Sequence, residues 1–239
     1  MQSKGGCLTD EEAVLLEAAR AAERSGNYAA AFNEWQHLAF VTNRPDYLCK
    51  VGLTAEKLGR WTEAENAFLE AINLDKAFWL AMVGLGSLFL RRTDSDPSAN
   101  ARTAKAWLEQ AVAAVPSPIT LSFLGEAHHQ LGEDEEAREA FRKAIELDAS
   151  YEEAYFNLGV LLADDGQHEE AERVLRAATR LDPNFHEAHG RLGILLHELG
   201  RYFEAEVELR RAIEIDPTDT IARSYLARPA GANKPSKPS

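Results

Sequence analysis

Apolar residues recur at helical spacing along the chain, and a turn signal follows each such stretch. In one stretch, Tyr155, Leu158 and Leu162 lie three and four residues apart, which places them on one face of a helix. Gly166 follows, and glycine ends helices readily because it adopts the left-handed backbone conformation without strain. The next segment, residues 168–181, carries alanine and leucine on one face and charged residues on the other. This pattern predicts two amphipathic helices joined by a tight turn.

The same helix–turn–helix pattern repeats along the chain with a period of about 34 residues. The pair Leu158 and Gly159 recurs in the next period as Leu192 and Gly193. The turn glycines that recur with it are Gly26, Gly59, Gly132, Gly166 and Gly200. A single helix pair of this size cannot bury its apolar faces, so neighbouring pairs must stack on one another. We therefore expect an all-α fold of stacked antiparallel helix pairs.

The repeated pattern resembles that of the tetratricopeptide repeat family. In the stretch 152–185, the positions that the family pattern specifies hold Tyr155, Leu158, Gly159, Leu162, Ala171, Leu175, Ala178 and Pro183. Small residues at Gly159 and Ala171 are expected to let the two helices of a pair approach closely. The resemblance covers nearly the whole chain and implies a right-handed α-solenoid superhelix.

We expect one solenoid domain, residues 12–226, preceded by a lead-in at residues 1–11 and followed by a disordered tail at residues 229–239. The domain is predicted to contain six repeats and a short C-terminal cap, at residues 12–44, 45–78, 79–117, 118–151, 152–185, 186–219 and 220–228.

Two features depart from the regular pattern. The third repeat is longer than the others because of residues 91–103. Asp96 and Pro97 in this stretch resemble an N-cap and a first helical residue, which predicts that the second helix of the repeat starts near Pro97. The alternative is a loose surface insertion. Asn43 stands where the family pattern has proline, which predicts a looser turn.

The composition and net charge of the chain limit which classes of molecule it is expected to bind. The chain is 45% hydrophobic and carries a formal net charge of −13, so phosphate backbones repel it and we expect no nucleic-acid binding. The longest apolar run, residues 77–90, is shorter than the roughly 20 residues that span a bilayer, so no membrane insertion is expected. We expect a cytoplasmic protein, with a periplasmic or lipid-anchored protein processed at Gly6 and Cys7 as the alternative.

Candidate chemistry is sparse. The sequence contains no nucleophile motif, phosphate-binding glycine loop or paired cysteine motif. His186, His189 and His197 lie near one another in sequence, but their spacing is not that of a zinc protease helix, and His189 falls at a packing position. We therefore expect no catalytic residue, no metal site and no cofactor, and we predict that the protein is not an enzyme.

The family resemblance assigns partner binding to a concave groove formed by one stripe of each first helix. The residues at these positions are Cys49, Leu53, Glu56, Leu80, Val83, Ser87, Leu90, Ile119, Ser122, Glu126, His129, Glu153, Phe156, Val160, Ala163, Gly190, Ile194 and His197. About half are apolar, and contiguous exposed apolar surface usually marks a binding site. The alternative is that superhelical curvature buries these side chains against the next repeat.

We therefore predict a non-enzymatic scaffold that binds a peptide or amphipathic helix of another protein in an apolar groove. Residues 118–239 carry 24 acidic and 14 basic side chains, so a basic partner should associate faster than an acidic one. One alternative is a chaperone or assembly factor for a secreted or membrane-complex protein, since the sequence resembles small tetratricopeptide chaperones of bacterial secretion. The other is a module that forms homo-oligomers through its terminal edges.

Overall fold

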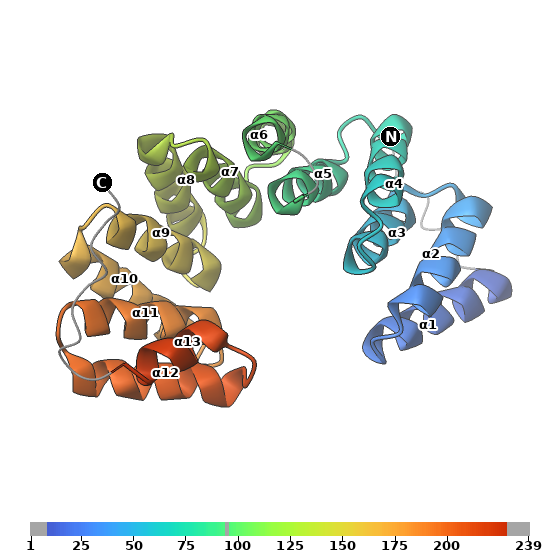
Figure 1. The fold of residues 1–239 in the computed structure, drawn as a ribbon. Helices are drawn as coiled ribbons and strands as arrows, with labels where there is room; N and C mark the ends of the chain where they lie inside the picture. The colour runs from blue at the N-terminus through green and yellow to red at the C-terminus, as the bar shows by residue number, and fades with distance from the viewer. Residues whose placement is uncertain (1–8, 94–95, 229–239) are drawn as a thin grey trace. The chain divides into compact units, whose positions relative to one another are not determined.

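The computed structural model describes residues 9–93 and 96–228, which form thirteen α-helices joined by short turns (Figure 1). This part of the chain contains no strand, so the predicted all-α fold class is confirmed. Contacts between Cα atoms divide the chain into two compact units, residues 1–116 and 117–239. The expectation of one continuous solenoid domain stays a prediction.

Two further predictions concern residues outside this described part. The lipid-anchor alternative at Gly6 and Cys7 falls there, and so does the disordered tail at residues 229–239. Among the helices that the structure does describe, none is long and apolar enough to cross a membrane.

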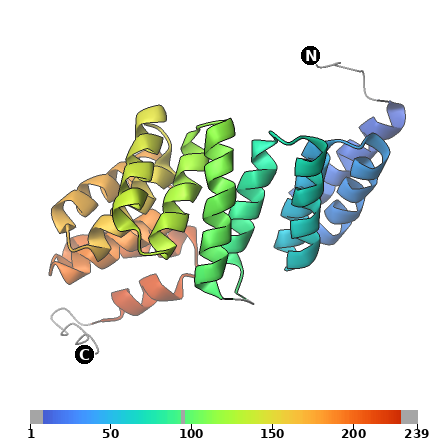
Figure 2. The same ribbon diagram turned by 90° about the horizontal axis from the view of Figure 1, so that it is seen from above.

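The first unit consists of three helical hairpins. Its helices are α1 (Asp10–Arg24), α2 (Tyr28–Thr42), α3 (Pro45–Lys57), α4 (Trp61–Leu74), α5 (Trp79–Arg91) and α6 (Pro97–Ala114). Helices α1 and α2, α3 and α4, and α5 and α6 form antiparallel pairs (Figures 1 and 2). Because α2 packs on α3 and α4 packs on α5, each pair stacks on the next within this unit.

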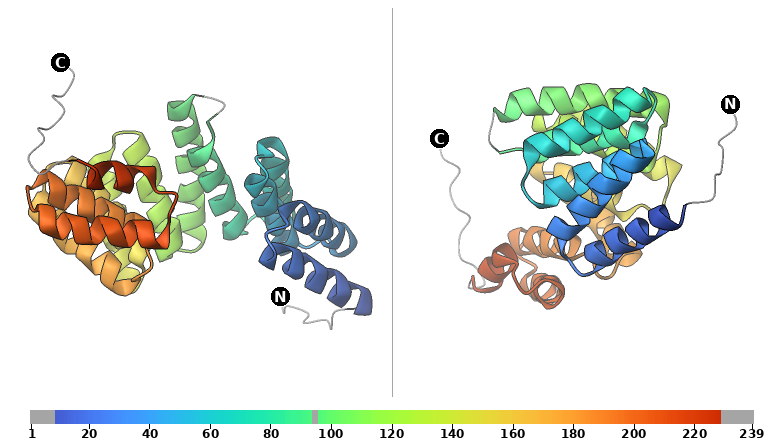
Figure 3. Two further views of the ribbon diagram at one scale, coloured as in Figure 1. Left: turned by 60° about the horizontal axis from the view of Figure 1, so that its bottom comes forward. Right: turned by 90° about the vertical axis from the view of Figure 1, so that its right-hand side faces the viewer.

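The second unit contains three more hairpins and a short final helix. Its helices are α7 (Pro118–Gln130), α8 (Asp134–Leu147), α9 (Glu152–Asp164), α10 (His168–Leu181), α11 (His186–Glu198), α12 (Tyr202–Ile215) and α13 (Thr220–Leu226). Helix α8 packs on α9, α10 packs on α11, and α13 packs on both α11 and α12 (Figure 3). The predicted arrangement of stacked helix pairs with a short C-terminal cap is therefore confirmed.

The turns within the hairpins have the predicted chemistry. All five turn glycines have a positive φ, between 69° at Gly59 and 79° at Gly200. Asn43 is the one non-glycine residue with a positive φ, 51°, in the described part of the chain. It caps the end of α2, and its N–H donates to the Ala39 carbonyl at 2.8 Å. This bond ends α2 in the same way as the other second helices end, so the looser turn expected at Asn43 stays a prediction.

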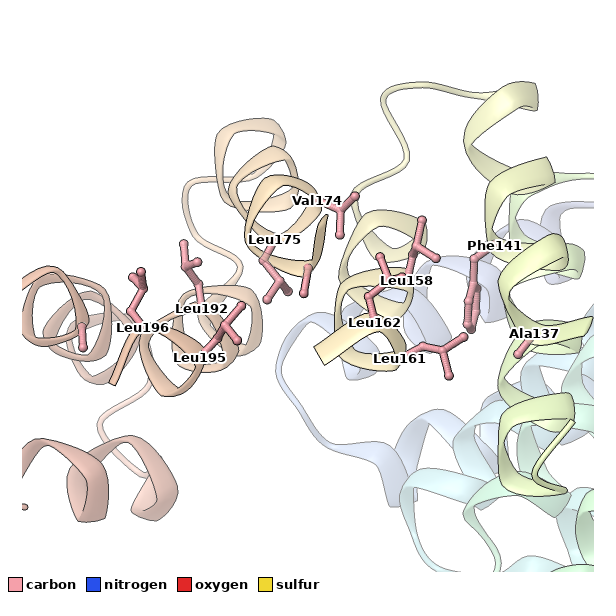
Figure 4. Close-up of a cluster of buried hydrophobic side chains, with 12 residues drawn as sticks. Ala137, Phe141, Leu158, Leu161, Leu162, Val174, Leu175, Leu192, Leu195 and Leu196 are labelled. Atoms are coloured by element: carbon pink, nitrogen blue, oxygen red, sulfur yellow. The ribbon is translucent and has the colours of Figure 1, made fainter. Parts of the chain in front are cut away.

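The apolar faces of neighbouring hairpins merge into one core in the second unit. Phe141 of α8 points toward Leu158 of α9, and Leu175 of α10 lies between α9 and Leu192 of α11 (Figure 4). Each of these side chains is at most 3% exposed. A Cβ on Gly159 would stand 2.6 Å from Cγ of Leu175, so the close approach of α9 and α10 predicted at Gly159 is confirmed.

Part of the additional length of the third repeat lies in its second helix, α6. Helix α6 begins at Pro97 as predicted, and the Asp96 carboxylate accepts a hydrogen bond from the Ser98 N–H at 3.0 Å. Asn100 is buried in the first turns of this helix and donates to the Arg92 carbonyl at 3.1 Å. A loose surface insertion is therefore the wrong alternative for residues 96–103.

Candidate functional site

The predicted groove positions of the first unit lie on α3 and α5, two first helices that contact each other. Two of their apolar side chains are well exposed, Leu53 at 44% and Leu80 at 46%. Glu56 forms an ion pair with Arg91 at 3.0 Å, and Leu90 is half-buried. The stripe therefore presents separate apolar side chains rather than a continuous apolar surface.

Three other predicted groove residues of this unit are buried. Cys49, Val83 and Ser87 are between 6% and 8% exposed. Burial, with a smaller contribution from the carboxylate of Asp46, raises the pKa of the Cys49 thiol to about 12. The Ser87 hydroxyl donates to the Gly84 carbonyl at 3.1 Å, so its hydrogen-bonding need is met within α5. These three side chains are therefore largely inaccessible to a partner.

In the second unit the predicted positions lie on α7, α9 and α11, with α9 contacting both of the others. On α7, Ile119 is 40% exposed, whereas Ser122 is only 4% exposed. Glu126 and His129 are half-buried on the same helix, and His129 Nδ1 lies 2.9 Å from Asp134 Oδ1.

On α9 the apolar residues of the stripe are neither fully buried nor fully exposed. Phe156, Val160 and Ala163 are all half-buried. The ring of Phe156 packs on that of Phe185, with centroids 5.0 Å apart. Glu153 stands one turn before Phe156, in the first turn of the helix. An acidic group and an apolar surface therefore lie next to each other on α9.

The C-terminal cap covers the predicted positions of the last repeat. Ile194 packs into the cluster that includes Ala222 and Tyr225 of α13. The His197 ring lies edge-on to the Tyr225 ring, with centroids 5.5 Å apart. A Cβ on Gly190 would lie 3.4 Å from a carboxylate oxygen of Asp219, the N-cap of α13. The uncovered part of the predicted stripe in this unit is therefore on α7 and α9.

Two polar atoms on α7 and α9 lack a hydrogen-bond partner in the described structure although they are buried. They are the hydroxyl oxygen of Ser122 and Oε2 of Glu153. Burial raises the pKa of the Glu153 carboxyl, a hydrogen bond from its own backbone N–H lowers it in part, and the nearby carboxylates of Glu152 and Asp182 raise it further. Ser122 Oγ and Glu153 Oε2 are themselves inaccessible, but the Glu153 residue as a whole is only half-buried.

The histidines of α11 lie near one another in sequence but interact with different residues. His189 is buried, with Nδ1 2.7 Å from Glu208 Oε2 and Nε2 3.3 Å from the Pro183 carbonyl. His186 instead lies beside Glu187, with Nδ1 2.9 Å from its carboxylate. The predicted packing role of His189 is confirmed. The described residues contain no group of three side chains that could hold a metal ion.

One concave feature was not predicted from the sequence. A cleft of about 530 Å³ in the first unit lies between α2 and α4 and has α3 as its floor. Phe40, which is 88% exposed, stands at its rim. The sequence contains a feature that could have predicted this cleft, because Phe40 is an aromatic residue on the polar face of a second helix.

Comparisons with known proteins agree on the fold. A family model described as TPR repeat matches residues 125–166, and two described as tetratricopeptide repeat match residues 162–228 and 45–78. A search of curated proteins finds no match.

Several solved structures are similar to this chain. PilW, described as a widely conserved type IV pilus biogenesis factor, is 12% identical with a TM-score of 0.74, over 92% of this chain and 100% of that one. MamA from Desulfovibrio magneticus RS-1 is 22% identical with a TM-score of 0.59, over 75% of this chain and 99% of that one. YrrB, described as a TPR protein with an unusual peptide-binding site, is 21% identical with a TM-score of 0.52, over 80% and 96%.

Identities this low show a shared fold and nothing more. The three family models carry the assignment, because together they cover residues 45–78 and 125–228, more than half of the chain. Their matches fall on the helix pairs that the structure contains in both units. The chain belongs to the tetratricopeptide repeat family.

Proposed function

We propose that this protein is a non-enzymatic interaction scaffold that binds a peptide or amphipathic helix of another protein along its first helices. The observation that carries the proposal is the exposed apolar surface of the first helices, where Leu53, Leu80 and Ile119 are 44%, 46% and 40% exposed. Exposed apolar side chains at the positions that the family resemblance assigns to partner binding favour a protein segment as the ligand.

The chemistry of the site favours a basic segment. A Lys or Arg side chain beside Glu153 would stabilise the ionised carboxylate, whose pKa burial raises in the unbound protein. Ile119, Phe156 and Val160 lie on the same two helices and provide apolar surface for the non-basic side chains of the segment. The excess of acidic over basic side chains in residues 118–239 would speed the encounter.

Leu53 and Leu80 provide a second apolar contact region in the first unit. Both project from first helices with nearly half of their surface exposed. The buried side chains of Cys49, Val83 and Ser87 are largely inaccessible to a partner. Substitutions that test binding should therefore be made at Leu80 and Ile119 rather than at Val83.

The test uses two groove variants and one matched control. Leu80→Glu and Ile119→Glu each place a carboxylate at the second residue of a first helix, where the helix dipole tolerates negative charge. Phe203→Glu makes the same change at the second residue of α12, where the phenylalanine is 80% exposed. All three variants should keep the helical circular dichroism spectrum of the wild type.

Affinity capture from native extract, read by mass spectrometry, compares the four proteins. We expect a partner that the wild type and Phe203→Glu retain and that at least one groove variant loses. With that partner in hand, Glu153→Gln should weaken its binding by about tenfold or more, because a charge-assisted hydrogen bond is lost. Identical partners for all four proteins would contradict the proposal.

Two narrower alternatives remain proposals. An assembly factor would keep an apolar client protein in solution, and the pilus biogenesis factor PilW has the same fold over its whole length. A self-assembling module would instead show a mass by light scattering that rises with concentration. Client protection without stable partner capture would favour the first alternative, and concentration-dependent mass without client protection the second.

A further inference from the structure

The cleft of the first unit lies on the side of α3 that faces away from the predicted groove. Its floor contains Leu48 and Val51 of α3. Successive helical residues are about 100° apart, so these two side chains project away from the face that holds Cys49 and Leu53. A partner bound in this cleft would therefore leave the groove face of α3 uncovered.

The walls of the cleft are the facing sides of α2 and α4. Helix α2 contributes residues spaced three and four apart, including Phe32, Gln36 and Phe40. Helix α4 contributes another such stripe, including Glu63 and Glu70. Both helices pack on α3 but not on each other, so the space between them stays accessible.

In the second unit, ion pairs span the equivalent gaps between second helices. Arg142 of α8 reaches Glu170 of α10 at 3.4 Å, and Arg176 of α10 reaches Glu204 of α12 at 2.9 Å. Within the described residues of the first unit, no ion pair joins α2 to α4. The gap between α2 and α4 thus lacks such ion pairs, and the Arg60 guanidinium at the N-cap of α4 crosses it only at one end, 5.1 Å from the centroid of the Phe32 ring.

Phe40 is an apolar residue at a repeat position that is otherwise polar. Counted from the turn glycine, the corresponding residues of the other regular repeats are polar, namely Asn73, Glu146, Arg180 and Glu214. Phe40 is 88% exposed, and Val41 beside it is 47% exposed. A large aromatic side chain at the rim of a cleft is a typical anchor for a bound protein segment.

The charged side chains that line the cleft indicate which kind of protein segment it would bind. Its lining includes the carboxylates of Glu63 and Glu70 and no lysine or arginine. Glu63 forms an ion pair with Arg60 at 3.5 Å, whereas Glu70 has no ion-pair partner among the residues described. We propose that the cleft between α2 and α4 binds a basic amphipathic helix of another protein, with apolar side chains against Phe40 and a Lys or Arg beside Glu70.

A designed peptide tests this proposal without knowledge of the natural partner. The probe is a fluorescein-labelled amphipathic helix of leucine and lysine, compared by fluorescence anisotropy with the same helix carrying glutamate for lysine. The cleft variants are Phe40→Ser and Glu70→Lys, both at exposed positions where folding is not at risk. Their matched controls are Phe203→Ser on α12 and Glu146→Lys on α8, which make the same changes at exposed residues outside the cleft.

We expect the lysine helix to bind and the glutamate helix not to bind. Phe40→Ser and Glu70→Lys should each weaken binding about tenfold or more, while Phe203→Ser and Glu146→Lys change it less than twofold. Equal losses in cleft and control variants would mean that net charge alone attracts the peptide and would overturn the proposal. Loss in Leu80→Glu with none in the cleft variants would also overturn it, since the peptide would then occupy the first-helix groove and support the proposed function.

Discussion

The ring of Phe68 lies directly against the backbone of Gly84. A Cβ placed on Gly84 would stand 2.5 Å from Cε1 of Phe68, closer than any real contact. Phe68 belongs to α4 and Gly84 to α5, so this contact joins one hairpin to the next. The ring is fully buried, and a Cβ on Gly52 would stand equally close to Cε1.

Gly84→Ala should therefore destabilise the protein by about 1–3 kcal/mol, as overpacking of a core does. Gly190→Ala is the matched control, because a Cβ there meets only ordinary contacts, the nearest at 3.4 Å. In that helix alanine should stabilise by about 0.5–1 kcal/mol through its higher helix propensity. Urea denaturation followed by circular dichroism measures both, and equal effects of the two substitutions would contradict the packing argument.

Cys49 should react slowly in the folded protein. Burial raises the pKa of its thiol to about 12, so at pH 8 only about one thiol in ten thousand is ionised. In a Cys7→Ser background, alkylation by iodoacetamide should be at least about 100-fold slower in native protein than in urea, because the thiolate is the reacting form. Similar rates in both conditions would show that Cys49 lies open on the groove face.

The ion pairs that Glu172 of α10 forms with Arg176 and with Arg201, the N-cap of α12, predict a pH dependence of stability. Burial raises the pKa of Glu172, but hydrogen bonds from Arg176 and Arg201 outweigh it and hold this pKa below its usual value. A carboxyl with a lowered folded pKa stabilises the protein above its unfolded pKa of about 4.3, and this contribution disappears as the pH falls through the folded pKa.

Glu172→Gln should therefore lower the free energy of unfolding at pH 7 by about 1 kcal/mol or less, the size typical of partly exposed pairs. The difference from wild type should shrink steadily as the pH falls below about 4 and through the folded pKa. Urea midpoints measured across this range provide the comparison. A difference that stays constant with pH would show that the substitution acts through packing and not through charge.

Sequence patterns sufficed for the features that depend on local structure. The turn glycines, the start of α6 at Pro97 and the contact of Gly159 with Leu175 all follow from residues within one hairpin. Helix periodicity and capping chemistry are local, so one repeat predicts them as well as the whole chain does.

The candidate site was predicted less completely, because exposure depends on neighbouring hairpins. Cys49 and Leu53 share the predicted stripe of α3, yet one is 7% exposed and the other 44%. Ile194 fits the groove pattern equally well, but it packs with α13, which only the folded chain places there. The cleft beside Phe40 arises from the spacing of two helices that do not touch, which no single-helix pattern encodes.

His189 and Glu208 form a largely buried polar pair, and its contribution to stability depends on both side chains being present. His189 Nδ1 lies 2.7 Å from Glu208 Oε2, and their side chains are only 11% and 17% exposed. Removing one residue leaves the facing atom, His189 Nδ1 or Glu208 Oε2, without this partner, whereas replacing both by apolar side chains leaves neither of these two atoms in place. His189→Leu and Glu208→Leu should each destabilise the protein by about 1–3 kcal/mol. The double variant should cost less than the sum of the two, by about 1 kcal/mol or more, in a double-mutant cycle measured by urea denaturation. Strictly additive losses would mean that the two side chains contribute independently and that the contact itself adds no stability.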